Sequence, residues 1–102
     1  MKQISKKQSR INRELNRIKR KLAYENDHCR ICGARAVDLA HLLPRSMYPE
    51  YQTEEWNVTL LCRRCHTQFD DNVEFRQKYK HLARYIKDID ELAYNRYYEN
   101  WR

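Results

Sequence analysis

The sequence predicts a small α+β protein in which a zinc-bound core of two short strands lies between an N-terminal and a C-terminal helix. A chain of 102 residues allows one domain, residues 1–102, and little more. All four cysteines, the single glycine and both prolines fall in residues 27–72, while the flanking segments carry apolar residues at helical spacing. Such a short chain buries only about 60–65% of its unfolded surface, so a metal staple would help it fold.

Residues 1–26 are expected to be a basic N-terminal segment that is helical from about residue 3. Apolar residues recur at steps of seven, four, three and four and form a one-sided stripe: Ile4, Ile11, Leu15, Ile18 and Leu22. Residues 1–22 hold nine Lys and Arg side chains against Glu14 alone, a net charge of +8, whereas the rest of the chain carries −1. This concentration favours a polyanion such as nucleic acid, and a solvated helix face is the alternative.

Residues 27–72 are expected to form the core of the protein. The apolar pieces Ala36–Leu43 and Trp56–Leu61 suit two strands, separated by the loop Pro44–Glu55. The prediction is therefore an antiparallel hairpin with a long connection.

Residues 73–102 are expected to form an amphipathic C-terminal helix. Apolar and aromatic residues recur there at three- and four-residue steps: Phe75, Tyr79, Leu82, Ile86, Ile89 and Leu92. Asp70, Asp71 and Asn72 precede the segment and are candidate N-caps. Aromatic residues at this spacing favour a buried core over a platform for stacked bases. The two terminal helices could pack on each other, form a homodimer or bind a protein partner.

The chain is expected to remain in a reducing cytosol. The opening residues MKQISKK lack the apolar core of a signal peptide, and no apolar run approaches the roughly 20 residues that span a membrane. In that compartment, paired cysteines are metal ligands more often than disulfides.

The cysteines form two C-x2-C pairs, Cys29 with Cys32 and Cys62 with Cys65. A two-residue spacing lets both thiolates of a pair reach one ion, and Gly33 suits the tight turn after the first pair. Four thiolates close a tetrahedral shell, so the sequence predicts a structural Zn²⁺ rather than a catalytic one. Two disulfides or four free thiols are the alternatives. The ion would tie the entry to the first strand to the exit from the second.

Three polar residues stand out near the cysteines: His41 in an apolar strand, Asn57 at the start of the second strand, and His66 directly after Cys65. Taken singly, each has an ordinary explanation, since a histidine in an apolar strand is usually a core residue. His66 could equally be an alternative zinc ligand. Asp70 follows His66 by one helical turn.

Taken together, these residues resemble the HNH endonucleases, in the zinc-stapled branch common in phages and mobile elements. The resemblance rests on Ala-His-Leu-Leu-Pro-Arg-Ser at residues 40–46 and Trp-Asn-Val-Thr-Leu-Leu-Cys-Arg-Arg-Cys-His at residues 56–66. It covers about residues 29–72, and the flanking helices lie outside it.

The resemblance implies a ββα-metal finger, two antiparallel strands and a helix around one catalytic cation. It assigns His41 as the general base, Asn57 as the residue that holds His41 in place, and His66 as a ligand of Mg²⁺, Mn²⁺ or Ni²⁺. The substrate implied is DNA, cut to leave a 5′ phosphate and a 3′ hydroxyl. Arg45, with Arg63 or Arg64, would hold flanking phosphates.

One position departs from the family, because many members place a metal ligand directly before the base and this chain has Ala40. Asp38 is the preferred replacement, on the same side of the strand as Ala40 but roughly 6–7 Å further along it. Asp70 is the second candidate. A zinc-stabilised DNA-binding module without catalysis is therefore the alternative function, and an interaction protein that uses its two apolar stripes is a third.

Overall fold

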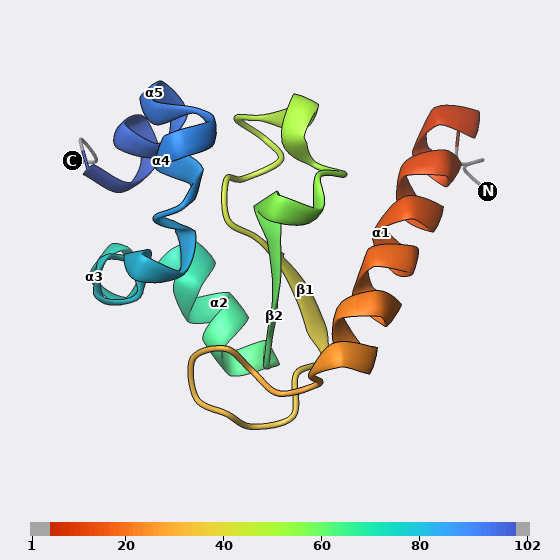
Figure 1. Cartoon of the computed structure of the whole chain (residues 1–102), viewed down its shortest axis with the longest axis horizontal. Helices are drawn as coiled ribbons and strands as arrows, with labels where there is room; N and C mark the ends of the chain where they lie inside the picture. The colour runs from red at the N-terminus through yellow and green to blue at the C-terminus, as the bar shows by residue number, and fades with distance from the viewer. Residues whose placement is uncertain (1–4, 100–102) are drawn as a thin grey trace.

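The computed structural model describes residues 5–99, which form a two-stranded antiparallel sheet with helices on both sides. In Figure 1 the sheet lies between helix α1 (Lys6–Glu25) on one side and helix α2 (Arg63–Asp71) with the C-terminal helices on the other. This confirms the predicted α+β class. None of the helices among these residues is long and apolar enough to cross a membrane.

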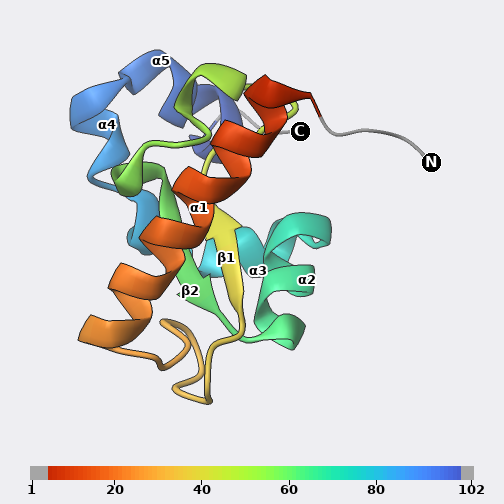
Figure 2. The same cartoon turned by 90° about the vertical axis from the view of Figure 1, so that its right-hand side faces the viewer.

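Helix α1 agrees with the predicted N-terminal helix, apart from residues 1–4, which lie outside the described residues. It begins at the N-cap Ser5, whose hydroxyl accepts the N–H of Gln8 at 3.0 Å. Ile18 is its buried residue, and the helix packs on the second strand, which Figure 2 shows behind it. The described part of the basic segment, from residue 5 on, is therefore packed against the sheet and is not a free arm.

The sheet pairs β1 (Asp38–His41) with β2 (Val58–Leu61), so that Asp38 lies opposite Leu61 and His41 opposite Val58. Both strands are shorter than predicted. The short 3-10 helix η2 (Glu55–Asn57) takes the start of the predicted second strand, and the first strand is shorter by two residues at each end. A further 3-10 helix, η1 (Pro49–Tyr51), lies in the long connection.

The prediction of one continuous C-terminal helix is wrong. The segment is broken into α3 (Val73–Lys78), η3 (Lys80–Ala83), α4 (Ile86–Ile89), α5 (Glu91–Tyr94) and one turn of π-helix, η4 (Asn95–Glu99). Asn72, one of the N-cap candidates, caps α3 through its side chain. Asp90 causes one of the breaks, since it leaves the helical conformation and caps α5 through its side chain.

The breaks fold the C-terminal segment around the core and bury three of its aromatic residues, Tyr94, Tyr97 and Tyr98. The buried core joins residues of the sheet, α2 and this segment: Ala40, Leu42, Leu43, Leu61, Phe69, Ala83, Ile86, Tyr94 and Tyr98. The expected apolar stripe is only partly buried, because Ile89 is 48% exposed and Leu92 is 84% exposed. The two terminal segments flank the sheet from opposite sides rather than pairing along their length (Figure 1).

Candidate functional site

The two cysteine pairs meet at one end of the sheet. Within residues 5–99, the four cysteines are the one group of ligand-type side chains whose donor atoms all lie within 4.8 Å of one another. The Sγ atoms of Cys32 and Cys62 are 3.6 Å apart, and a tetrahedral site with Zn–S bonds of about 2.3 Å places its sulfurs roughly 3.8 Å apart. The thiolates therefore fit, and can hold, one zinc ion.

The backbone around the cysteines has the form expected of a zinc knuckle. The N–H of Ile31 donates to Cys29 Sγ, and the N–H of Cys65 donates to Cys62 Sγ, each at 3.4 Å. Gly33 adopts φ +79°, the left-handed conformation for which glycine is suited. Cys62 is also the N-cap of α2, so the same residue that would bind zinc fixes where this helix begins. The zinc site thereby sets the position of His66 in the first turns of α2.

His41 ends β1 and is held by a backbone carbonyl. Its Nε2 lies 2.8 Å from the carbonyl oxygen of Gln52, and a carbonyl oxygen can only accept, so Nε2 carries the proton and Nδ1 of the neutral ring has a free lone pair. Burial lowers the pKa of His41 below its usual 6.5, and the charges of Arg45 and His66 act in the same direction. The imidazole is therefore neutral at pH 7, as a general base must be.

Asn57 is completely buried and bonds across the loop that begins after His41. Its Oδ1 accepts the N–H of Leu43 at 2.8 Å, and its Nδ2 donates to the carbonyls of Leu43 and Tyr51, each at 3.1 Å. Asn57 thus ties the two ends of the loop together. Its action on His41 is indirect, because Tyr51 immediately precedes Gln52, which supplies the carbonyl for the histidine.

His66 lies between two carboxylates. Its Nδ1 is 2.9 Å from Asp38 Oδ2, and its Nε2 is 3.1 Å from Asp70 Oδ2. These contacts, the one to Asp70 first, raise the pKa of His66 to about 9. Both nitrogens then carry protons and donate, so the ring is an imidazolium in this arrangement.

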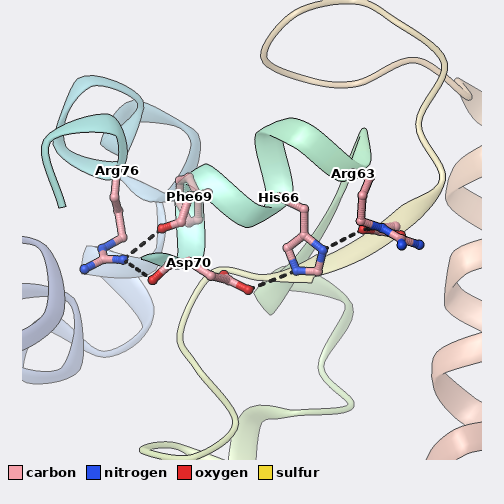
Figure 3. A network of polar contacts seen from close by, with 6 residues as sticks. Arg63, His66, Phe69, Asp70 and Arg76 are labelled. Carbon is pink, nitrogen blue, oxygen red and sulfur yellow. Dashed lines mark hydrogen bonds and ion pairs between the residues drawn. The ribbon is translucent and has the colours of Figure 1, made fainter. Parts of the chain in front are cut away.

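Arg63 extends the row of charges at the other end. Its Nε and Nη2 donate to the two oxygens of Asp38 at 2.7 and 2.9 Å, which holds the pKa of Asp38 below its usual value. Figure 3 shows Arg63, His66 and Asp70 in sequence along α2, with Arg76 at its far end. The buried Arg76 donates to the carbonyls of Phe69 and Asp70 and so secures the last turn of the helix.

A groove of about 790 Å³ joins these residues. His41, His66, Asp38 and Asp70 line it, which brings together both aspartates that the sequence left as alternatives. The other lining residues come from α1, the loop after β1, α2 and the C-terminal segment: Leu15, Asn16, Lys19, Leu39, Pro44, Arg45, Arg63, Thr67, Asp71 and Tyr97. Ala40, in contrast, is fully buried in the core.

Two groups of the candidate site were not placed there by the sequence reasoning. Gln52 acts through its backbone carbonyl, which no side-chain motif reveals. Lys19 lines the groove from α1 although it lies outside the core segment; its position one residue after the apolar Ile18 of the stripe is the signal that could have identified it. Arg64 is exposed and is not among the groove-lining residues.

Two antiparallel strands followed by a helix lie beside a four-cysteine cluster suited to zinc, with one histidine on the first strand and another on the helix. This arrangement is consistent with the ββα-metal class of fold. Residues 29–73 match the family described as HNH endonuclease, and this match supports the assignment of the segment to that family. At the level of the family, the match indicates a nuclease function. No curated protein and no solved structure is significantly similar to the chain.

Proposed function

We propose that this protein is a divalent-metal-dependent endonuclease that hydrolyses phosphodiester bonds in DNA. The observation that carries the proposal is the orientation of His41. Its Nε2 is occupied by the Gln52 carbonyl at 2.8 Å, while its ring lines the groove that also contains His66 and two aspartates. A histidine held by one nitrogen and neutral at pH 7 is suited to take a proton from an attacking water.

The base acts through Nδ1, the nitrogen that the Gln52 bond leaves without a proton. Once the ring has accepted a proton from water, it becomes an imidazolium that still donates through Nε2 to Gln52. The nearby carboxylate of Asp70 raises the pKa of His41 and so favours this charged form, against the effect of burial. The same arrangement therefore holds the ring before and after the proton moves.

His66, with the carboxylate of Asp38 or Asp70, supplies the donors for the divalent ion. One imidazole nitrogen and carboxylate oxygens suit Mg²⁺, Mn²⁺ or Ni²⁺, so the chemistry of the donor set fits. When bound, the ion supplies positive charge to the scissile phosphate and to the departing 3′ oxygen. For this, His66 must release one of its two protons and exchange one carboxylate contact, and Arg63 must loosen its hold on Asp38.

Cations around the groove support nucleic acid as the substrate. Lys19 and Arg45 line the groove, and the side chain of Arg63 is 75% exposed, so it can turn from Asp38 to a phosphate. On α1, Arg10, Arg13 and Arg20 are exposed and extend the positive surface beyond the groove. Such contacts bind phosphates and carry no sequence preference.

The test is the nicking of supercoiled plasmid by zinc-loaded protein, with and without Mg²⁺ or Mn²⁺, beside the His41→Ala variant. Nicking that needs the added ion and is lost in the variant, while zinc content and fold are retained, is the expected result. Loss of zinc from His41→Ala would contradict the separation of the two sites.

A non-catalytic DNA-binding module is the second candidate. It is favoured because the carboxylate of Asp38 already accepts hydrogen bonds on both oxygens and so has none left for a metal ion. Arg63 and His66 together occupy both oxygens of this carboxylate, and Ala40 provides no ligand. A folded, zinc-loaded protein that binds duplex DNA but does not nick it with any of the three ions would establish this alternative.

A further inference from the structure

Three tyrosine hydroxyls join the C-terminal helices to the segment that follows His41, here called the histidine loop (residues 42–57). Tyr98 donates to the carbonyl of Leu42, and Tyr85 donates to the carbonyl of Trp56. In the third bond the direction is reversed, since Tyr51 of the loop donates to Asp90 Oδ2 at 2.5 Å.

Each bond reaches a residue directly beside a part of the proposed base assembly. Leu42 follows His41, and Tyr51 precedes Gln52. Trp56 likewise precedes Asn57. A displacement of any of these three neighbours would therefore move the residue beside it, which is His41, Gln52 or Asn57.

The Leu42 peptide is held on both sides. Its N–H donates to the backbone carbonyl of Asn57 at 2.8 Å, and its own carbonyl accepts from Tyr98, whose side chain is fully buried. Burial raises the pKa of Tyr98 well above its usual value, so the phenol keeps its proton at neutral pH and remains a donor. The ring of Tyr98 also packs near Phe69 of α2, with 6.4 Å between ring centroids.

The far half of the loop is fixed in a similar way. Asp90 accepts the N–H of Ala93 at 3.0 Å as the N-cap of α5, and its other oxygen accepts from Tyr51. The Tyr51 ring in turn meets Trp56 edge to face at 4.9 Å. A carboxylate that starts a helix therefore also anchors the loop beside Gln52.

We propose that the C-terminal segment positions the histidine loop through Tyr98, Tyr85 and Asp90, and that the reaction depends on this bracing. The proposal rests on the function proposed above for His41. The three residues lie beyond residue 73, where the family match ends, so the brace comes from outside the matched core. Productive geometry at a general base tolerates little displacement, and a shift of about 1 Å can cost roughly 10²-fold in rate.

The experiment compares Tyr98→Phe with Tyr94→Phe in the full, zinc-loaded chain. Both substitutions remove one hydroxyl from a buried ring of the same segment, but Tyr94 bonds Glu99 at 3.3 Å and not the loop. Metal-dependent nicking gives kcat and KM, and imidazole NMR signals give the tautomer and environment of His41. We expect Tyr98→Phe to lower kcat about tenfold or more with KM within about twofold and to shift the His41 signals, while Tyr94→Phe changes neither.

If Tyr98→Phe does not fold, the same measurements are made on Tyr85→Phe and Asp90→Asn. Tyr85 is 44% exposed, so the loss of its hydroxyl should disturb the core less. Unchanged kcat and unchanged His41 signals in the folded variants would overturn the brace, even if the wild type nicks DNA. A wild type that does not nick would refute the proposed function instead. In that case the His41 signals still decide whether the three residues position the ring.

Discussion

Asn57 offers the sharpest test of how the site is held together. Replacement by alanine removes three hydrogen bonds at a residue with no exposed surface, and it leaves one N–H and two carbonyls of the loop without that partner. Each bond contributes about 1 kcal/mol, and a buried group left unsatisfied costs about 1–3 kcal/mol. We therefore expect Asn57→Ala to lose about 3–5 kcal/mol of unfolding free energy, a large part of the roughly 5–15 kcal/mol of a typical domain.

The assay is urea and thermal unfolding of zinc-saturated protein. For a domain near 100 residues, 1 kcal/mol corresponds to about 4–8 °C, so Tm should fall by at least about 12 °C. Asn12→Ala is the matched control, because Asn12 lies on α1 and accepts only the exposed Gln8 side chain. Its effect should stay within about 0.5 kcal/mol.

Asn57→Asp separates the donor from the acceptor. It keeps an oxygen for the N–H of Leu43 but places a second oxygen against the carbonyls of Leu43 and Tyr51. We expect a loss at least as large as that of the alanine variant. A loss below about 1 kcal/mol in both variants would refute the view that this residue ties the loop.

Four further predictions concern charge and metal. Burial lowers the pKa of His41, and the neutral ring is the active form of the proposed base. The logarithm of kcat for nicking should therefore rise with pH only below about 6.5 and then become constant. An inflection above pH 7 would contradict the role of His41 as the base. The pKa of His66 is raised to about 9 in the folded protein, so the protonated ring stabilises the folded state. This contribution to the unfolding free energy is fully present below the unfolded pKa of about 6.5 and is lost as the pH rises through 9. Urea unfolding without added divalent ion should show that loss in wild type, and His66→Gln should reduce it. Cys32→Ser should lower both the zinc content and the Tm although Cys32 is exposed, because its side chain stabilises the fold through the metal. A variant with less zinc and the Tm of the wild type would show that the metal contributes nothing to stability. Replacing both Arg13 and Arg20 by glutamine should reduce the salt dependence of DNA affinity by up to about two units of log–log slope, with kcat retained, as fluorescence anisotropy would measure.

Some of these features follow from local sequence and could be predicted. The four-cysteine cluster depends on two-residue spacings within each pair, and α1 depends on a single uninterrupted apolar stripe, so the cluster and the helix are both confirmed. That the cluster binds zinc stays a prediction. His41 and His66 were likewise identified by their order relative to the cysteines, and they do line one groove. Their catalytic roles stay predictions.

The rest depends on tertiary contacts that no local pattern records. The sequence left Asp38 and Asp70 as alternatives. Asp70 reaches His66 within α2, one turn further along the helix, but only the packing of β1 beside α2 brings Asp38 to the opposite nitrogen of the ring. The C-terminal breaks were missed because the periodicity continues through Asp90, even though its side chain stops one helix and starts the next. Ile89 matched the apolar stripe but is half exposed, since the chain turns after it.

The bonds of Tyr85, Asp90 and Tyr98 to the histidine loop have a consequence for the order of assembly. Both cysteine pairs precede these residues in the chain, so a ribosome releases everything needed for the zinc-bound hairpin first. The contact between Leu42 and Tyr98 closes a span of 56 residues and must form after it. A nascent chain could thus bind its metal before the position of His41 is fixed. The ability to cleave DNA would then be gained only late in folding.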